Sequence, residues 1–183
     1  MKSIVVSCLA CALGAAAAAG APAPSADEAG LDLIQARYAG TWTVSETAYA
    51  TDFSRPGTKQ YDITRDCAPT GAVLDCKLMA QGVQQGEQRF TWDAKAGSYR
   101  VDMDIGGHPQ PELSLTVKDA AWTFLQEVPG PGGKPIQLRI QRQYRSPSEV
   151  SYSVDYSRDG ASWTLMSKGT EVRRDETSTK PAP

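Results

Sequence analysis

Alternation of apolar and polar residues runs through most of this chain and constrains its fold more than any other feature. In Ser98–Ile105, apolar Tyr99, Val101, Met103 and Ile105 alternate with polar residues. This period of two is typical of a half-buried antiparallel strand. Ten segments show the pattern: Thr41–Ala50, Thr58–Cys67, Ala72–Ala80, Glu87–Asp93, Ser98–Ile105, Glu112–Lys118, Ala121–Val128, Ile136–Arg145, Val150–Ser157 and Ser162–Arg173.

The links between these segments are short and rich in Gly, Pro and Asp, as in Arg55–Gly57 and Arg158–Gly160. Short links join neighbouring antiparallel strands, whereas parallel strands need crossovers of a dozen or more residues. Ten such strands can bury their apolar faces by closing into a barrel, which also removes exposed sheet edges. The sequence therefore predicts an all-β fold, an antiparallel up-and-down β-barrel of about ten strands.

One apolar face of each strand is expected to line the barrel interior. Because ten strands enclose more room than eight, some interior space is expected as well. The residues predicted to face inward are Trp42, Val44, Tyr61, Ile63, Leu74, Leu78, Phe90, Trp92, Tyr99, Val101, Met103, Ile105, Leu113, Leu115, Val117, Trp122, Phe124, Ile136, Leu138, Ile140, Tyr152, Val154, Trp163 and Leu165.

A short amphipathic helix precedes the strands. Ser25 to Glu28 matches a capping box, and Leu31, Ile34 and Tyr38 recur at helical spacing before Gly40. A chain of 183 residues is long enough for one domain with a substantial core. The predicted domain spans residues 25–174, and the polar segment 175–183 is predicted to be a disordered tail.

Residues 1–20 have the composition of a secretory signal peptide. Lys2 leads into an apolar run that ends in small residues, with cleavage expected near Ala19 and Gly20. The run is mostly Ala and Gly and is marginal for a membrane span, so a periplasmic or secreted location is predicted. The alternative is a lipid anchor on Cys8 or Cys11.

Two cysteines, Cys67 and Cys76, remain after cleavage of the leader. A turn near Thr70 and Gly71 would place them opposite each other on paired strands. An exported chain meets an oxidising compartment, so a structural disulfide is predicted. A redox centre would instead present two cysteines two residues apart at the start of a helix.

Charge and histidine content exclude several classes of function. Loss of Lys2 leaves 18 basic and 21 acidic residues, and this weakly acidic balance argues against nucleic acid as a partner. The one histidine, His108, lies in a Gly- and Pro-rich turn, so neither a zinc site nor a serine triad can be assembled around it readily.

Asp102 and Asp104 lie in phase with the solvent face, which argues against a glycosidase pair. The prediction is therefore a monomeric protein that is not an enzyme and holds no cofactor.

The motifs Tyr38-Ala-Gly-Thr-Trp42, FTWDAKAGSY, AWTF and SRDGASWTLM resemble those of lipocalin-like, calycin-type barrels, in particular an uncharacterised group of small bacterial secreted domains. This resemblance implies a β-barrel whose cavity binds a small apolar or amphipathic molecule. It also implies that a late cation covers the entry Trp42, for which Lys168, Arg173 and Arg174 are candidates. Related haem-binding barrels suggest an alternative, a haem or nitrogen-oxide binder that uses His108.

Charged and hydroxyl-bearing residues in phase with apolar strand faces are the candidate ligand site. Glu46 follows Trp42 and Val44, and Arg142 follows Ile140, each at an inward position. An inward charge is costly unless it is paired or reaches water, so Arg142, together with Arg65, is hypothesised to attract an anionic head group at the barrel mouth. The competing interpretation is that Arg142 is a charge on the rim. The remaining candidates are Tyr61, Tyr152, Tyr156 and Trp92, and a filled barrel that binds partners through an apolar outer patch is the alternative to ligand binding.

Overall fold

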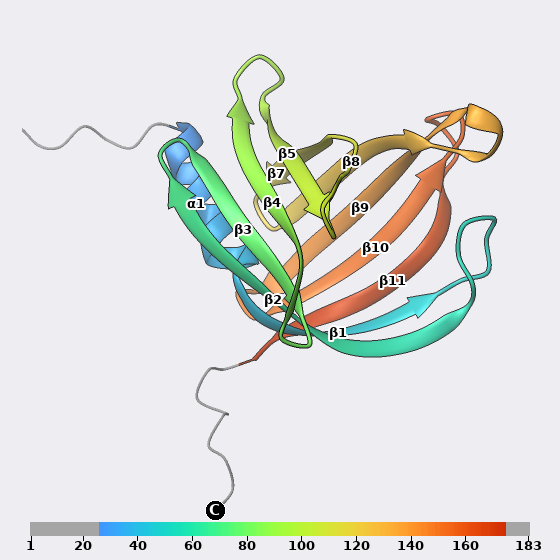
Figure 1. Ribbon diagram of the computed structural model, residues 1–183, viewed down its shortest axis with the longest axis horizontal. Helices are drawn as coiled ribbons and strands as arrows, with labels where there is room; N and C mark the ends of the chain where they lie inside the picture. Colours follow the sequence, from blue (N-terminus) through green and yellow to red (C-terminus); the bar gives the residue numbers. More distant parts are fainter. Residues whose placement is uncertain (1–25, 175–183) are drawn as a thin grey trace, which may run out of the picture.

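The computed structural model describes residues 26–174 as one helix and a closed antiparallel barrel (Figure 1). The signal peptide and the C-terminal tail predicted above lie outside these residues. The elements are α1 (Ala26–Tyr38), β1 (Gly40–Ala48), β2 (Gly57–Thr70), β3 (Val73–Ala80), β4 (Val83–Asp93), β5 (Ser98–Ile105), β6 (His108–Pro109), β7 (Leu113–Lys118), β8 (Ala121–Pro129), a 3-10 turn (Pro131–Gly133), β9 (Pro135–Ser146), β10 (Glu149–Ser157) and β11 (Thr164–Arg173).

The strands follow one another around the barrel in chain order, which confirms the predicted up-and-down topology. The order is β4-β3-β2-β1-β11-β10-β9-β8-β7-β5, and pairing of β4 with β5 closes the ring. All ten predicted strands are present, with ends that differ by a few residues. The additional strand β6 is a two-residue extension paired only with the end of β5.

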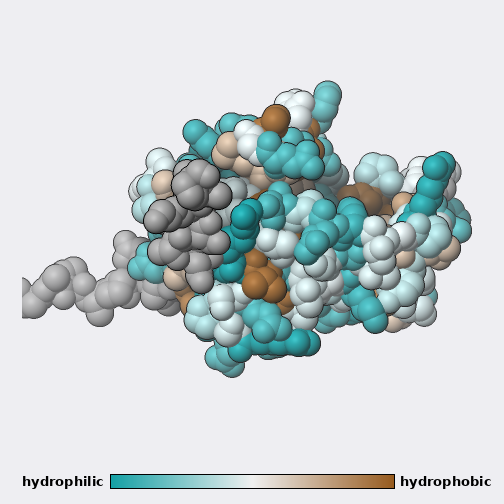
Figure 2. Space-filling model, turned by 90° about the horizontal axis from the view of Figure 1, so that it is seen from below, coloured by the Kyte–Doolittle hydropathy of each residue, from teal (hydrophilic) through white to brown (hydrophobic). Residues whose placement is uncertain are grey.

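Most residues predicted to face inward do so, and one continuous core results. Trp42, Phe90, Val101, Leu115 and Trp122 are fully buried within it. The face of the molecule in Figure 2 is hydrophilic over most of its area, with hydrophobic residues confined to small separate patches. Burial of the apolar strand faces is thus the main force that closes the sheet.

Two residues predicted to face inward, Leu165 and Trp163, lie on the outer face, and a third, Ile105, is exposed. The register of β10 and β11 shifts between Val154 and Asp155, so that Leu165 pairs with Asp155 on the outer face. Trp163 precedes β11 and stacks on outer-face Arg139, whose guanidinium lies 4.0 Å from its ring centroid. A bulge reverses the inward and outward alternation, and the sequence pattern does not reveal it. Ile105, the last residue of β5, lies opposite Gly86 and is 39% exposed.

The predicted disulfide is present. Cys67 of β2 lies directly opposite Cys76 of β3 in the register, and their sulfur atoms are bonded. The β2 and β3 strands are joined by a tight turn at Gly71 and Ala72, as the spacing of the cysteines predicts.

No helix among the described residues is long and apolar enough to span a bilayer.

Candidate functional site

The barrel interior is closed at the end covered by α1 and reaches solvent at the other end. In β1, β2, β5 and β8, inward-facing residues near α1 are buried, and those farther away are at least partly exposed. In β1 this change occurs between Val44 and Glu46, and in β2 it occurs between Arg65 and Ile63. The same change is present in β5 and β8, whereas Ile136 of β9 and Tyr156 of β10 stay buried at the end remote from α1. The half of the barrel remote from α1 is here called the open half, because several of its inward-facing side chains reach solvent.

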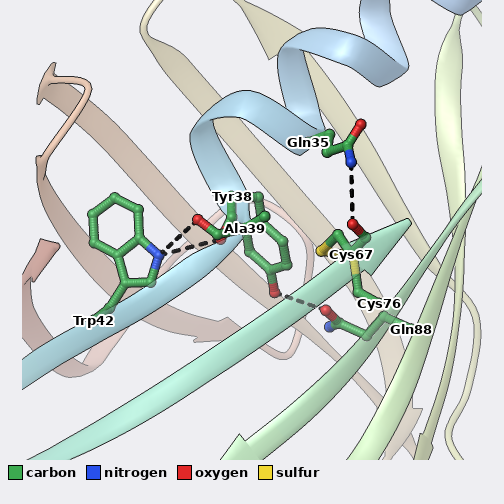
Figure 3. Close-up of a disulfide and its surroundings, with 7 residues drawn as sticks. All are labelled: Gln35, Tyr38, Ala39, Trp42, Cys67, Cys76 and Gln88. Atoms are coloured by element: carbon green, nitrogen blue, oxygen red, sulfur yellow. Dashed lines mark hydrogen bonds between the residues drawn. A yellow bond between two sulfur atoms is a disulfide. The ribbon is translucent and has the colours of Figure 1, made fainter. Parts of the chain in front are cut away.

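The end of α1 is fastened to the barrel by hydrogen bonds (Figure 3). The indole Nε1 of Trp42 donates to the carbonyl oxygen of Tyr38 at 3.2 Å, and the Tyr38 hydroxyl donates to Gln88 Oε1 at 2.7 Å. The amide of Gln35 donates to the carbonyl oxygen of Cys67, beside the disulfide. These bonds hold the helix as a fixed cover.

Arg173 is the late cation that covers the entry tryptophan. Its guanidinium lies 4.7 Å from the Trp42 ring centroid and donates to the carbonyl oxygens of Ala36 and Arg37, at the C-terminal end of α1. A cation at this position pairs with the last helix carbonyls and with the aromatic face together. Of the other two candidates, Arg174 pairs with Asp62, and Lys168 lies over the ring of Tyr49.

Two arginines and one glutamate form a buried ion cluster beneath α1. Arg65 donates from Nη1 and Nη2 to Glu171 at 2.8 and 3.0 Å, and Arg142 donates to the same carboxylate at 2.8 and 2.6 Å. All three residues are at most 6% exposed, and the Arg65 guanidinium stacks on the ring of Tyr38 at 4.4 Å. Arg142 is therefore neither a rim residue nor located at the mouth, and both interpretations made from the sequence are wrong on this point.

The carboxylate of Glu171 occupies the place that the sequence analysis gave to a ligand anion. Burial alone would raise the pKa of Glu171, but the two guanidinium groups outweigh it and lower that pKa to about 2. Burial acts to lower the pKa of Arg142, and attraction to Glu171 raises it above its ordinary value. The three side chains of the cluster are thus ionised over the whole physiological pH range, and each charge is stabilised by its oppositely charged neighbours.

A second polar group, here called the mouth cluster, consists of Glu46, Lys59, Tyr61 and Tyr152. The hydroxyls of Tyr152 and Tyr61 donate to Glu46 Oε2 at 3.1 and 3.4 Å, and Lys59 Nζ lies 3.4 Å from the same oxygen. The Glu46 side chain is 14% exposed, whereas that of Lys59 is 61% exposed. The structure thus brings together three of the predicted ligand-site residues, from β1, β2 and β10.

Gly169 of β11 allows Tyr152 to reach Glu46. Gly169 pairs with Glu46 on one side and with Tyr152 on the other. A Cβ atom at this position would lie 2.8 Å from the Tyr152 hydroxyl and 2.3 Å from the carbonyl oxygen of Ser45. Any larger residue would therefore push the Tyr152 ring away from the carboxylate.

The other predicted site residues lie elsewhere. Trp92 packs against Tyr99 at the end of the barrel near α1, with ring centroids 4.9 Å apart. Tyr156 is buried against Phe53 of the β1–β2 loop. His108 is exposed on β6, outside the barrel, which removes the geometric basis of the haem hypothesis.

The carboxylates of Asp102 and Asp104 face outward, as predicted, and line an outer groove of about 630 Å³. Within residues 26–174, no group of three or more His, Cys, Asp or Glu side chains is arranged to hold a metal ion.

Glu171 of the buried ion cluster and Gly169 beside the mouth cluster were not singled out by the sequence analysis. The signal for Glu171 was available, since Ser167, Gly169 and Glu171 continue an inward-facing series next to Val44 and Glu46. The apolar alternation does not reveal this series, because serine and glycine are not apolar residues that indicate an inward-facing strand face.

Comparison with known proteins supports the fold only. No protein-family model and no curated protein matches the sequence. Among solved structures, the S-type phycobiliprotein lyase CPES from Guillardia theta aligns with a TM-score of 0.53 at 9% identity, covering 83% of this chain and 99% of the lyase. Rv2717c from M. tuberculosis aligns at 0.49 and 13% identity, covering 79% and 97% of the two chains.

The fold is therefore a lipocalin-like β-barrel, a closed ten-strand meander preceded by one helix.

Proposed function

We propose that this protein is an exported, non-enzymatic carrier that binds a small apolar or amphipathic molecule in the open half of its barrel. The observation that carries the proposal is the partial exposure of several inward-facing apolar side chains in the open half, among them Ile63 and Met103, whereas those beneath α1, such as Trp42, are fully buried. Partly exposed apolar side chains on a concave surface gain free energy when a ligand covers them.

The lining of the open half suits such a ligand. Inward-facing Ile63, Met103, Leu138, Ile140 and Val154 are all partly exposed, and the mouth cluster adds a few polar groups among them. Binding sites for small molecules commonly combine an apolar lining with a small number of placed polar groups. A ring of ten strands is also wide enough to leave room that its own side chains do not fill.

Binding is favoured over catalysis by the state of the interior ionisable groups. Arg65 and Arg142 are each bound through two nitrogens to Glu171, and these three groups are nearly inaccessible to solvent. A catalytic acid or base must instead be free to exchange a proton with a substrate. Export is supported by the leader composition of residues 1–20 and by the disulfide, which is typical of an oxidising compartment.

Native mass spectrometry of the protein purified from its own host tests the proposal directly. A carrier is expected to retain a small molecule, visible as a discrete mass above that of the polypeptide. A probe makes the test independent of the natural ligand: the neutral dye N-phenyl-1-naphthylamine should fluoresce on binding to the purified, delipidated protein.

A pair of variants on β9 localises that binding. Ile140 faces inward and Gln141 faces outward, so Ile140→Trp fills the open half and Gln141→Trp leaves it empty. Dye affinity should fall about tenfold or more in Ile140→Trp and stay unchanged in Gln141→Trp, with both variants folded by circular dichroism. If the wild type binds no dye and carries no molecule, the barrel is filled and the carrier role is wrong.

A further inference from the structure

The mouth cluster presents hydrogen-bond acceptors, and few donors, to the open half of the barrel. All three contacts to Glu46, from Tyr61, Tyr152 and Lys59, reach the same oxygen, Oε2. Within residues 26–174, no hydrogen bond reaches Glu46 Oε1, and this atom is not among the fully buried polar atoms. An accessible carboxylate oxygen in a partly apolar setting is a strong acceptor that lacks a donor.

The two tyrosines cannot supply the missing donor. Burial and the nearby Glu46 charge raise the pKa values of both Tyr61 and Tyr152, so each hydroxyl keeps its proton. Each proton is already directed to Glu46. What each hydroxyl offers a ligand is therefore its remaining lone pair, which is again an acceptor.

Lys59 shows which chemical group this arrangement holds. Its ammonium lies 3.4 Å from Glu46 Oε2 and 5.3 Å from the centroid of the Tyr61 ring, so that it contacts both a carboxylate and an aromatic face. This pairing is typical of ammonium recognition. Because the Lys59 side chain is 61% exposed, it can swing into solvent when another cation arrives.

The buried ion cluster does not offer an equivalent place for an anion. Both Nη atoms of Arg65 and both of Arg142 are bound to Glu171, and all three residues are nearly inaccessible. A ligand carboxylate at the mouth would face Glu46 and two tyrosine oxygens, with only exposed Lys59 to balance it. Like charges placed together in this way oppose binding.

We infer that the mouth cluster selects ligands whose polar end is a protonated amine, with the apolar part of the ligand inside the open half. This inference rests on the proposed carrier function and specifies the class of its ligand. The ligand ammonium would bind Glu46 Oε1 and the hydroxyl oxygens of Tyr61 and Tyr152, and it would either add to Lys59 or displace it.

Three probes with the same chain and different head groups test this selectivity. Decylamine, decanol and decanoic acid are titrated at pH 7, below their micelle concentrations, and each is measured by displacement of N-phenyl-1-naphthylamine from the wild-type protein. Decylamine should bind about tenfold tighter than decanol and tighter still than decanoate, because only its head group is cationic.

Variants assign the preference to the cluster. Glu46→Gln keeps the shape of the side chain and removes its charge, so it should abolish the preference for decylamine and leave decanol binding unchanged. Glu149→Gln, which removes an exposed carboxylate paired with Arg145, is the matched control and should keep the preference. Lys59→Met removes the resident cation and should raise decylamine affinity severalfold.

The outcomes separate this inference from the carrier function beneath it. If decanol or decanoate binds as well as decylamine, or if Glu46→Gln keeps the preference, the inference is wrong and the carrier function stands. A preference for decanoate would instead direct attention to the buried arginines, whose Nε atoms lack hydrogen-bond partners among the described residues. If none of the three probes displaces the bound dye, the inference is wrong and the carrier function stands on the dye; if the dye does not bind either and no molecule is retained, both proposals are overturned.

Discussion

The buried ion cluster places three charged side chains in an interior that is otherwise mostly apolar. The fold accommodates these residues because each charge is neutralised by an opposite one. Glu171 is the central member, since it accepts two hydrogen bonds from Arg65 and two from Arg142. Taking three ions out of water is costly, so such a cluster is weak evidence of net stabilisation. Removal of its one carboxylate, in contrast, leaves two buried cations facing each other.

Glu171→Gln is therefore expected to destabilise the fold strongly. The free energy of unfolding should fall by about 3 to 5 kcal/mol, the usual effect of breaking a buried ion pair. Urea unfolding followed by tryptophan fluorescence measures it. Glu149→Gln breaks an exposed pair and should cost less than about 0.5 kcal/mol. Equal effects for the two variants would show that the cluster contributes little.

The Glu171 carboxylate should also make the free energy of unfolding depend on pH. Its pKa is about 2 in the folded protein and lies near its ordinary value when unfolded, so its contribution is complete above about pH 5 and is lost as pH falls toward 2. Between pH 7 and pH 3 this loss is about 2 kcal/mol. The stability difference between the wild type and Glu171→Gln should narrow over that interval. A constant difference would contradict the assignment.

Helix α1 closes the barrel through contacts at its C-terminal end. Variants of the adjacent residues Arg173 and Arg174 test those contacts. Arg173→Ala removes the cover of Trp42 and two bonds to helix carbonyls, and it should cost about 1 to 2 kcal/mol in unfolding free energy. Arg174→Ala removes only an exposed pair with Asp62 and should cost less than about 0.5 kcal/mol. Equal values would mean that Arg173 does not fasten the helix.

The β2–β3 hairpin is cross-linked by Cys67 and Cys76, nine residues apart. Reduction of this disulfide should lower the unfolding free energy by roughly 2 to 3 kcal/mol, because the unfolded chain regains the freedom of the short loop. Chemical denaturation with and without dithiothreitol measures the change. A Cys67→Ala, Cys76→Ala variant, which has no disulfide to reduce, should show no response to the reductant.

In the whole molecule, α1 covers one end of the barrel, and the proposed carrier function makes the other end open. Its dynamics should follow that division. Within β8, amides of Trp122–Phe124 near α1 should exchange hydrogen at least about tenfold more slowly than those of Gln126–Val128 in the open half. Hydrogen exchange followed by mass spectrometry or NMR resolves the two halves. Addition of a bound probe should slow exchange mainly in Gln126–Val128. Uniform protection along the strand would argue against an open half.

The alternation of apolar residues was sufficient to predict ten strands, their meander and the Cys67–Cys76 pair, because each strand buries one face and short turns force neighbours to pair. It failed at Leu165, where a bulge changes the alternation without changing the composition. It also identified Arg142 and Glu46 as inward charges, but not their partners. Glu171 lies 29 residues beyond Arg142 in the chain and 106 beyond Arg65.

The sequence by itself determined most of the inward-facing residues and the order in which the strands pair, because strand period and turn length are local properties. Only the tertiary structure decided which inward charges meet, since closure of the ring brings β1 beside β11 and places Glu171 between two arginines. The same closure sets Gly169 between Glu46 and Tyr152, and within residues 26–174 it leaves one carboxylate oxygen of Glu46 without a hydrogen bond. Cross-strand neighbours of this kind are fixed by register around a closed barrel, which no local pattern encodes.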